Sequence, residues 1–124
     1  MAATSTELLR KLADNDEIEI ETRRDSRSPL HRTTIWIVPT KKGVYIRSVY
    51  VKGRWYQEAL ANRNVAIRAR RRKAAARIQR VNDASVIRAV NAAAREKYGE
   101  RWPKDATSFV RLSRNRTTLR LIPL

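Results

Sequence analysis

The residues best suited to chemistry gather in one segment, residues 44–64, which reads VYIRSVYVKGRWYQEALANRN. Four of the eight aromatic residues of the chain fall within it, and the fixed positive charges Arg47, Lys52 and Arg54 lie among them. An aromatic face stacks on a planar ring, and a guanidinium or ammonium group pairs with an anion. The segment therefore predicts a site for a planar anionic ligand, either a phosphorylated cofactor or a nucleic acid.

The residue types that are missing limit the chemistry. The chain has no cysteine and one histidine, His31, which excludes disulfides, thiolate nucleophiles and metal sites built from cysteine or histidine. The sequence shows no carboxylate that would orient the ring of His31, so we do not assign it a catalytic role. Because no protein group stands out as a catalyst, we expect a bound cofactor to supply any difficult chemistry.

Charge is abundant and unevenly distributed. The formal net charge is +16, yet residues 1–21 hold six of the twelve acidic residues and only two bases. The rest of the chain is therefore strongly cationic. Such a surface attracts phosphates and polyanions and speeds their encounter, but it does not by itself define a site.

Length and hydropathy indicate a single domain over residues 1–124, with 42% hydrophobic residues for one modest core. No run of 18 apolar residues could span a membrane. The amino-terminal segment MAATSTELLRKLADNDEIEIE is too acidic and too polar for a secretory signal. We therefore expect a cytoplasmic protein without a membrane span.

Local patterns predict the elements that position the site. Thr4 and Glu7 have the spacing of a capping box, which predicts a short first helix. Alternation and β-branched residues predict three strands, joined as a meander, at residues 17–23, 31–38 and 44–50.

The second half of the chain predicts a hairpin between helices. In order, we expect a short helix at 56–61, hairpin arms at 65–71 and 74–81, a helix from Asp83 to Gly99, and strands at 108–112 and 117–124. The alanines of the second arm leave a helix there as an alternative. The order predicts an α+β, mainly antiparallel barrel of about six strands with peripheral helices, paired as a symmetric homodimer.

This order and three short motifs resemble the split β-barrel flavin-binding superfamily. The motifs are TRRDSRSPLHRTTIW at 22–36, VYIRS at 44–48 and GRWYQEALANRNV at 53–65. Over about residues 6–98, the chain looks closest to small uncharacterised bacterial proteins related to deazaflavin-dependent nitroreductases. The resemblance implies a split barrel that holds FMN or a deazaflavin coenzyme and transfers hydride to a small oxidised substrate.

The resemblance also implies a set of binding residues. The basic turn after the first strand would clamp phosphate, and the end of the third strand with the segment after it would border the ring. The residues so implied are Arg23, Arg24, Ser26, Arg32, Thr34, Arg47, Ser48, Lys52, Arg54 and Trp55. The turn lacks both glycines of the family's pattern, so a cofactor-less split barrel that acts as an interaction module is an alternative.

Nucleic-acid binding by the predicted hairpin is a second alternative. Residues 63–80 contain eight bases and no acid. Phosphate contacts would give binding with little sequence readout. The stretch contains no aromatic residue that could stack on a base, which is an argument against this alternative. The bases are Arg63, Arg68, Arg70, Arg71, Arg72, Lys73, Arg77 and Arg80.

Overall fold

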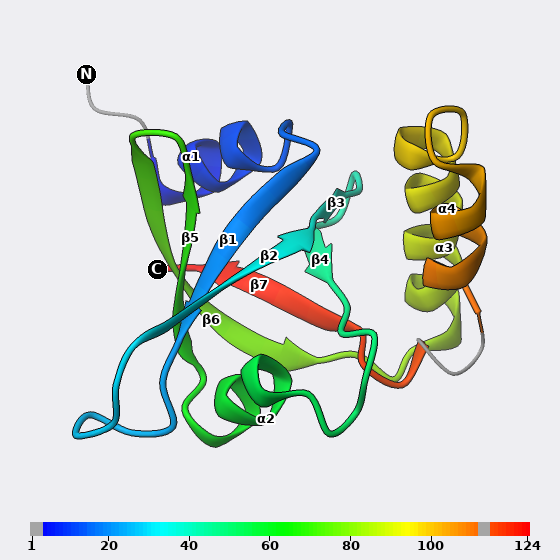
Figure 1. The fold of residues 1–124 in the computed structure, drawn as a ribbon. Coiled ribbons are helices and arrows are strands. Elements are labelled where there is room, and N and C mark those ends of the chain that lie inside the picture. Colours follow the sequence, from blue (N-terminus) through cyan, green and yellow to red (C-terminus); the bar gives the residue numbers. More distant parts are fainter. Residues whose placement is uncertain (1–3, 112–114) are drawn as a thin grey trace.

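The computed structural model describes residues 4–111 and 115–124, which form one curled antiparallel sheet with four helices around it (Figure 1). The strands are β1 (Glu17–Thr22), β2 (His31–Trp36), β3 (Val38–Pro39), β4 (Val44–Ile46), β5 (Asn64–Ala69), β6 (Arg72–Arg80) and β7 (Leu119–Pro123). The helices are α1 (Ser5–Leu12), α2 (Arg54–Ala61), α3 (Ala84–Tyr98) and α4 (Pro103–Phe109). Among the described residues, no helix is long and apolar enough to cross a membrane.

The sheet bends back on itself. Its strand order is β2-β1-β5-β6-β7-β4-β3, and all neighbours run antiparallel. β2 and β3 are the two ends of this order, although only Ile37 separates them along the chain. The sheet must therefore curl until its ends meet at Ile37, which makes a half-barrel. The predicted α+β class and antiparallel barrel are confirmed, with seven strands in the described residues.

Alternation along the strands places apolar side chains inside the curl. On β1, Ile18 and Ile20 are buried whereas Glu17 and Glu19 are exposed. Helices α1 and α2 cover this inner core (Figure 1). A second apolar cluster forms on the other face of β3 and β4, where α3 and α4 pack.

The corner at Ile37 is tied to α3. The Ile37 amide donates to Tyr98 Oη at 3.1 Å, and Ile37 O accepts from Lys97 Nζ at 2.8 Å. Lys97 Nζ also donates to the carbonyls of Ala13 and Asn15, just after α1. Burial lowers the pKa of Lys97 to about 8 and raises the pKa of Tyr98. Helix α3 thus fixes the point where the two ends of the sheet meet.

Several local predictions are confirmed. Thr4 Oγ1 accepts from the Glu7 amide at 3.1 Å and caps α1. Asp83 caps α3 by accepting from the Ser85 amide at 2.8 Å. The basic segment is a hairpin, β5–β6, so its second arm is a strand and not a helix.

Three predictions need correction. The meander holds for the pairs β1–β2 and β3–β4, but the predicted strand 31–38 breaks at Ile37 into β2 and β3, so β2 and β4 do not pair. The third strand ends at Ile46 instead of residue 50, because Ser48 starts a turn. Residues 108–109, predicted to begin a strand, end α4, and Leu112 lies outside the described residues.

Candidate functional site

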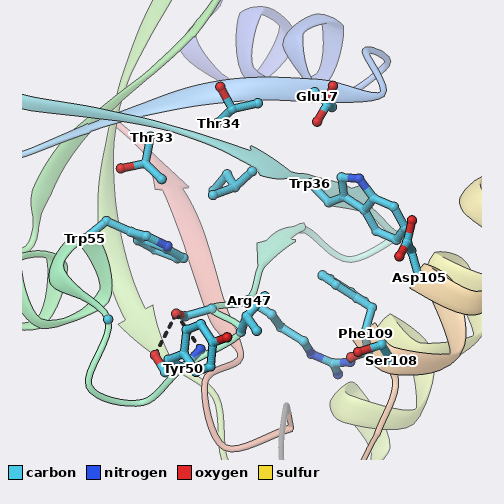
Figure 2. A pocket seen from close by; sticks show the side chains of 14 residues that line it. Glu17, Thr33, Thr34, Trp36, Arg47, Tyr50, Trp55, Asp105, Ser108 and Phe109 are labelled. Carbon is cyan, nitrogen blue, oxygen red and sulfur yellow. Dashed lines mark hydrogen bonds between the residues drawn. The ribbon is translucent and has the colours of Figure 1, made fainter.

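A pocket of about 440 Å³ opens at the split of the half-barrel (Figure 2). β2, the strand at one end of the sheet, supplies residues 33–36, and α4 supplies Asp105, Ser108 and Phe109. The third side is the segment from β4 into α2. Its lining residues are Arg47, Ser48, Val49, Tyr50, Gly53 and Trp55, with Glu17 of β1 nearby.

Aromatic side chains form the facing walls of the pocket. Trp55 stands on one side, and Trp36 with Phe109 on the other (Figure 2). Trp36 is stacked on Tyr98, with ring centroids 3.9 Å apart and planes at 8°, and Trp55 meets Tyr56 edge-on at 6.2 Å. Because these contacts already hold the rings, the pocket offers pre-formed flat faces to a planar ligand.

Arg47 is the one basic residue among the lining residues, which also include the acids Glu17 and Asp105, and it is only 3% exposed. Its Nε donates to Thr118 Oγ1 at 2.7 Å, and its Nη1 donates to Asn91 Oδ1 at 2.6 Å and to Phe109 O at 3.1 Å. Its Nη2 is buried without a hydrogen-bond partner, and no carboxylate in the described part of the chain pairs with it. Burial lowers the pKa of Arg47 to about 10, so the group is charged at neutral pH. A buried cation with a free donor favours an anionic ligand.

The turn after β4 positions Tyr50 at the pocket. Ser48 Oγ donates to Tyr50 O at 2.7 Å, and the Gly53 amide donates to the same carbonyl at 3.1 Å. A Cβ on Gly53 would lie 3.1 Å from Tyr50 O and 3.2 Å from Ser48 Oγ, so a larger residue would push this turn apart. The turn also leaves Val49, Tyr50 and Val51 exposed by 53%, 71% and 48%.

The structure brings together part of the residue set that the sequence implied. Thr34, Arg47, Ser48 and Trp55 line the pocket. Arg32 does not line the pocket. Its Nε donates to Glu21 Oε2 at 2.8 Å, and its side chain lies on the opposite face of β2 from that of Thr33. The remaining implied residues lie outside the lining, in the β1–β2 turn (Arg23, Arg24, Ser26) or around the start of α2 (Lys52, Arg54).

Sequence analysis missed the contribution of α4. Asp105, Ser108 and Phe109 line the pocket from this helix. A signal was present, because Pro103 occupies the first helical position and an acid follows in the first turn. Trp36 and Glu17, also missed, lie at the end of β2 and at the start of β1.

The eight bases of the hairpin are divided by the fold. Arg68 and Lys73 contact the buried Glu21 carboxylate, at 3.4 and 2.8 Å. Arg70, Arg71 and Arg72 surround the hairpin tip. The others, Arg63, Arg77 and Arg80, are exposed toward the opposite end of the hairpin.

His31 has a carboxylate partner that the sequence did not reveal. Its Nδ1 lies 2.9 Å from Glu58 Oε2, on α2, and Thr22 Oγ1 donates to Glu58 Oε1 at 2.8 Å. The His31 ring is therefore oriented from a helix 27 residues further along the chain, contrary to the sequence-based expectation. Neither His31 nor Glu58 lines the pocket.

A family described as "Uncharacterized protein conserved in bacteria (DUF2255)" matches residues 8–121. The chain belongs to the DUF2255 family. No curated protein matches the sequence. In residues 4–111 and 115–124 of this DUF2255 chain, no three His, Asp or Glu side chains are grouped so that they could hold a metal ion.

Solved structures share the fold at low sequence identity. HutZ, the heme storage protein from Vibrio cholerae, is 14% identical, with a TM-score of 0.67 and coverage of 98% of this chain and 92% of that one. A FAD-binding protein from Mesorhizobium loti is 13% identical, with a TM-score of 0.63 and coverage of 98% and 91%. An F420-H2 dependent reductase, FDR-A, is 12% identical, with a TM-score of 0.65 and coverage of 86% and 94%. These likenesses confirm the split-barrel fold of the DUF2255 chain.

Proposed function

We propose that this protein binds a flavin-type cofactor, FMN or a deazaflavin coenzyme, with the ring system between Trp55 and Phe109. The observation that carries the proposal is Arg47, a buried cation with an unpartnered Nη2 in a pocket with aromatic walls. The fold adds support, because similar structures include a FAD-binding protein and an F420-H2 dependent reductase.

The residues present fit such a group. The pocket volume, about 440 Å³, falls within the range of roughly 300–1,000 Å³ that small-molecule sites occupy. Flat walls suit the ring, and the positive charge of Arg47 suits an electron-rich carbonyl or an anion on its edge. Ser48 and Thr34 add hydroxyl groups to the lining.

Each part of the chain has a distinct role in this proposal. Arg47 provides positive charge near the ring, while Trp55 and Phe109 orient it and exclude water. Arg23, Arg24 and Ser26, in the turn between β1 and β2, would hold the phosphate of the cofactor's tail, since β2 leads from this turn to the pocket-lining Thr33. The cofactor, when bound, supplies hydride transfer, and the protein acts as a reductase of a small oxidised substrate.

A homodimer is part of the proposal. Val49, Tyr50 and Val51 are three consecutive exposed apolar residues, and two of them line the pocket. A contiguous apolar surface of this kind is typical of a protein interface. A second copy seated here would cover the apolar turn and close one side of the pocket.

Titration of the purified protein with FMN and with the deazaflavin coenzyme tests the proposal. We expect quenching of tryptophan fluorescence and a shifted cofactor absorbance. Arg47→Gln should weaken binding on the order of tenfold or more, since a charge-assisted hydrogen bond contributes about 1.5–3 kcal/mol. Arg54→Gln, which removes an exposed charge outside the pocket, is the matched control.

Because Arg47 also links β4 to α3, α4 and β7, Tyr50→Ala provides a second variant with little risk to folding. It should weaken binding while the fold, checked by far-UV circular dichroism, stays unchanged. If neither cofactor binds the native protein, the cofactor proposal is wrong and the pocket walls are core and interface.

A further inference from the structure

A second pocket, also about 440 Å³, lies where the tip of the β5–β6 hairpin meets the end of α1. Four of its seven lining residues are bases, Lys11, Arg70, Arg71 and Arg72, and none is an acid. None of these four bases forms an ion pair with a described residue. Their charges converge on one concave surface without compensation.

The backbone at the tip holds an arginine where glycine would be favoured. Ala69 pairs with Arg72, so Arg70 and Arg71 form a two-residue turn. Arg70 has a φ of 57°, in the left-handed region, which is unfavourable for a non-glycine residue. Short hairpin turns favour glycine or asparagine there. The tip therefore carries a charge at the expense of turn stability, a kind of strain that is concentrated at functional sites.

The neighbouring bases do not compete for a ligand. Arg68 and Lys73, which flank the tip on β5 and β6, already contact Glu21. The unpaired charge of the hairpin's tip is thus confined to the three consecutive arginines, and α1 adds Lys11 from a distant part of the sequence.

We propose that this basic pocket, formed by Lys11, Arg70, Arg71 and Arg72, binds the phosphate groups of a nucleic-acid strand. Its bases are exposed, and an exposed ion pair contributes little free energy, so one isolated phosphate would bind weakly. A strand presents successive phosphates, and each one neutralised releases counterions. The net charge of +16 also attracts the parts of the strand that lie outside the pocket.

The pocket also indicates how the strand is read. Its three remaining lining residues are Leu12, Asn15 and Ala69, so it offers no aromatic ring for a base to stack on. Since the proposed contacts are to phosphates, we expect binding to depend on the backbone and little on the base sequence. The pocket shares no lining residue with the proposed cofactor site, so each proposal can be tested independently of the other.

Fluorescence anisotropy with a labelled DNA strand of about 20 nucleotides, over a series of salt concentrations, tests this proposal. The test variant is Arg70→Gln with Arg71→Gln, and the matched control is Arg63→Gln with Arg80→Gln, which removes the same charge from the same hairpin away from the tip. Losing two phosphate contacts should reduce the log–log salt slope by about 1.4 and weaken binding at low salt at least tenfold. The control should keep the slope of the native protein.

Three results would overturn the proposal: no DNA binding at about 50 mM salt, equal losses in both double variants, or binding of inorganic pyrophosphate that DNA does not displace. The first two would make the arginines a solvated surface, and the third would make the pocket a site for small phosphates. An FMN titration of the tip variant, expected to match the native protein, keeps this outcome separate from the cofactor proposal.

Discussion

The Glu21 carboxylate lies 2.8 Å from the ammonium group of Lys73, on a strand 52 residues further along the chain. The same carboxylate contacts Arg32 at 2.8 Å and Arg68 at 3.4 Å, and Glu21 is 2% exposed. Burial raises the pKa of Glu21, but the hydrogen bonds from Lys73 and Arg32 outweigh it and the net pKa lies below the usual 4.5. One buried acid thus joins β1, β2, β5 and β6.

Replacing Glu21 with Gln should destabilise the protein and change its acid response. At neutral pH we expect the free energy of unfolding to fall by about 1.5–3 kcal/mol, because hydrogen bonds to a charged group are lost and three cations are left together. The folded pKa is lowered, so the stabilisation is complete above pH 4.5 and is lost as the pH falls through the folded value. The difference between native and variant protein should therefore shrink below pH 4.5.

Urea unfolding at neutral and acidic pH measures this difference. Glu19→Gln, on the same strand but exposed and without an ion pair among the described residues, is the control and should change little. A difference between Glu21→Gln and native protein that does not vary with pH would contradict the assignment.

The contact between His31 and Glu58 should appear as a coupling energy. A double-mutant cycle with His31→Ala and Glu58→Ala is expected to give about 0.5–3 kcal/mol, as for residues in direct contact. Combining Glu58→Ala with Asn64→Ala, which forms no hydrogen bond with Glu58 in the described residues, should be additive within roughly 0.3–0.5 kcal/mol. Additivity in both cycles would show that the His31 ring is not held by Glu58 in solution.

The proposed position of the cofactor predicts that Arg24 contacts its phosphate and not its ring. Arg24→Ala should weaken FMN binding on the order of tenfold, since a charge-assisted contact contributes about 1.5–3 kcal/mol. Riboflavin, which has the same ring without the phosphate, should bind native and variant protein equally. Equal affinity of FMN for both proteins would remove the β1–β2 turn from the site and leave Arg47 as its cation.

The proposed dimer predicts that a charge within the apolar turn prevents association. Tyr50→Glu should give a monomer, because a carboxylate would be buried without a partner in the interface. Lys52→Glu, in the same turn, is the control and should stay dimeric. Light scattering distinguishes these states, and a monomeric native protein would refute the dimer outright.

The sequence allowed the prediction of elements whose signals are local. The caps at Thr4 and Asp83 and the alternation of the hairpin arms depend on neighbouring residues, and all three are confirmed. The sheet order was not predictable in this way, because alternation shows that a strand is half-buried but not which strand lies beside it. Residues 19–21 pair with residues 66–68, and this pairing depends on how the whole sheet curls.

The candidate site was likewise predictable only where its residues are neighbours in the sequence. Arg47 and Trp55 fall in one segment, and the structure places both at the pocket. The property that makes Arg47 informative, its burial with a free Nη2, depends on Asn91, Phe109 and Thr118, which come from elements far along the chain. No local pattern contains that information.

The one-residue link at Ile37 gives the pocket a stiff side and a compliant side. Trp36, immediately before this link, is a wall of the pocket, and Ile37 itself is clamped by Tyr98 and Lys97 of α3. That wall moves only if the barrel seam opens, which requires loss of the buried α3 contacts and hence much of the free energy of unfolding. The exposed Val49–Val51 turn is held through its backbone by Ser48 and Gly53, while its side chains are exposed. We therefore expect the pocket to adjust to a ligand through these side chains, on the fast timescale of rotamer changes, while the seam stays shut.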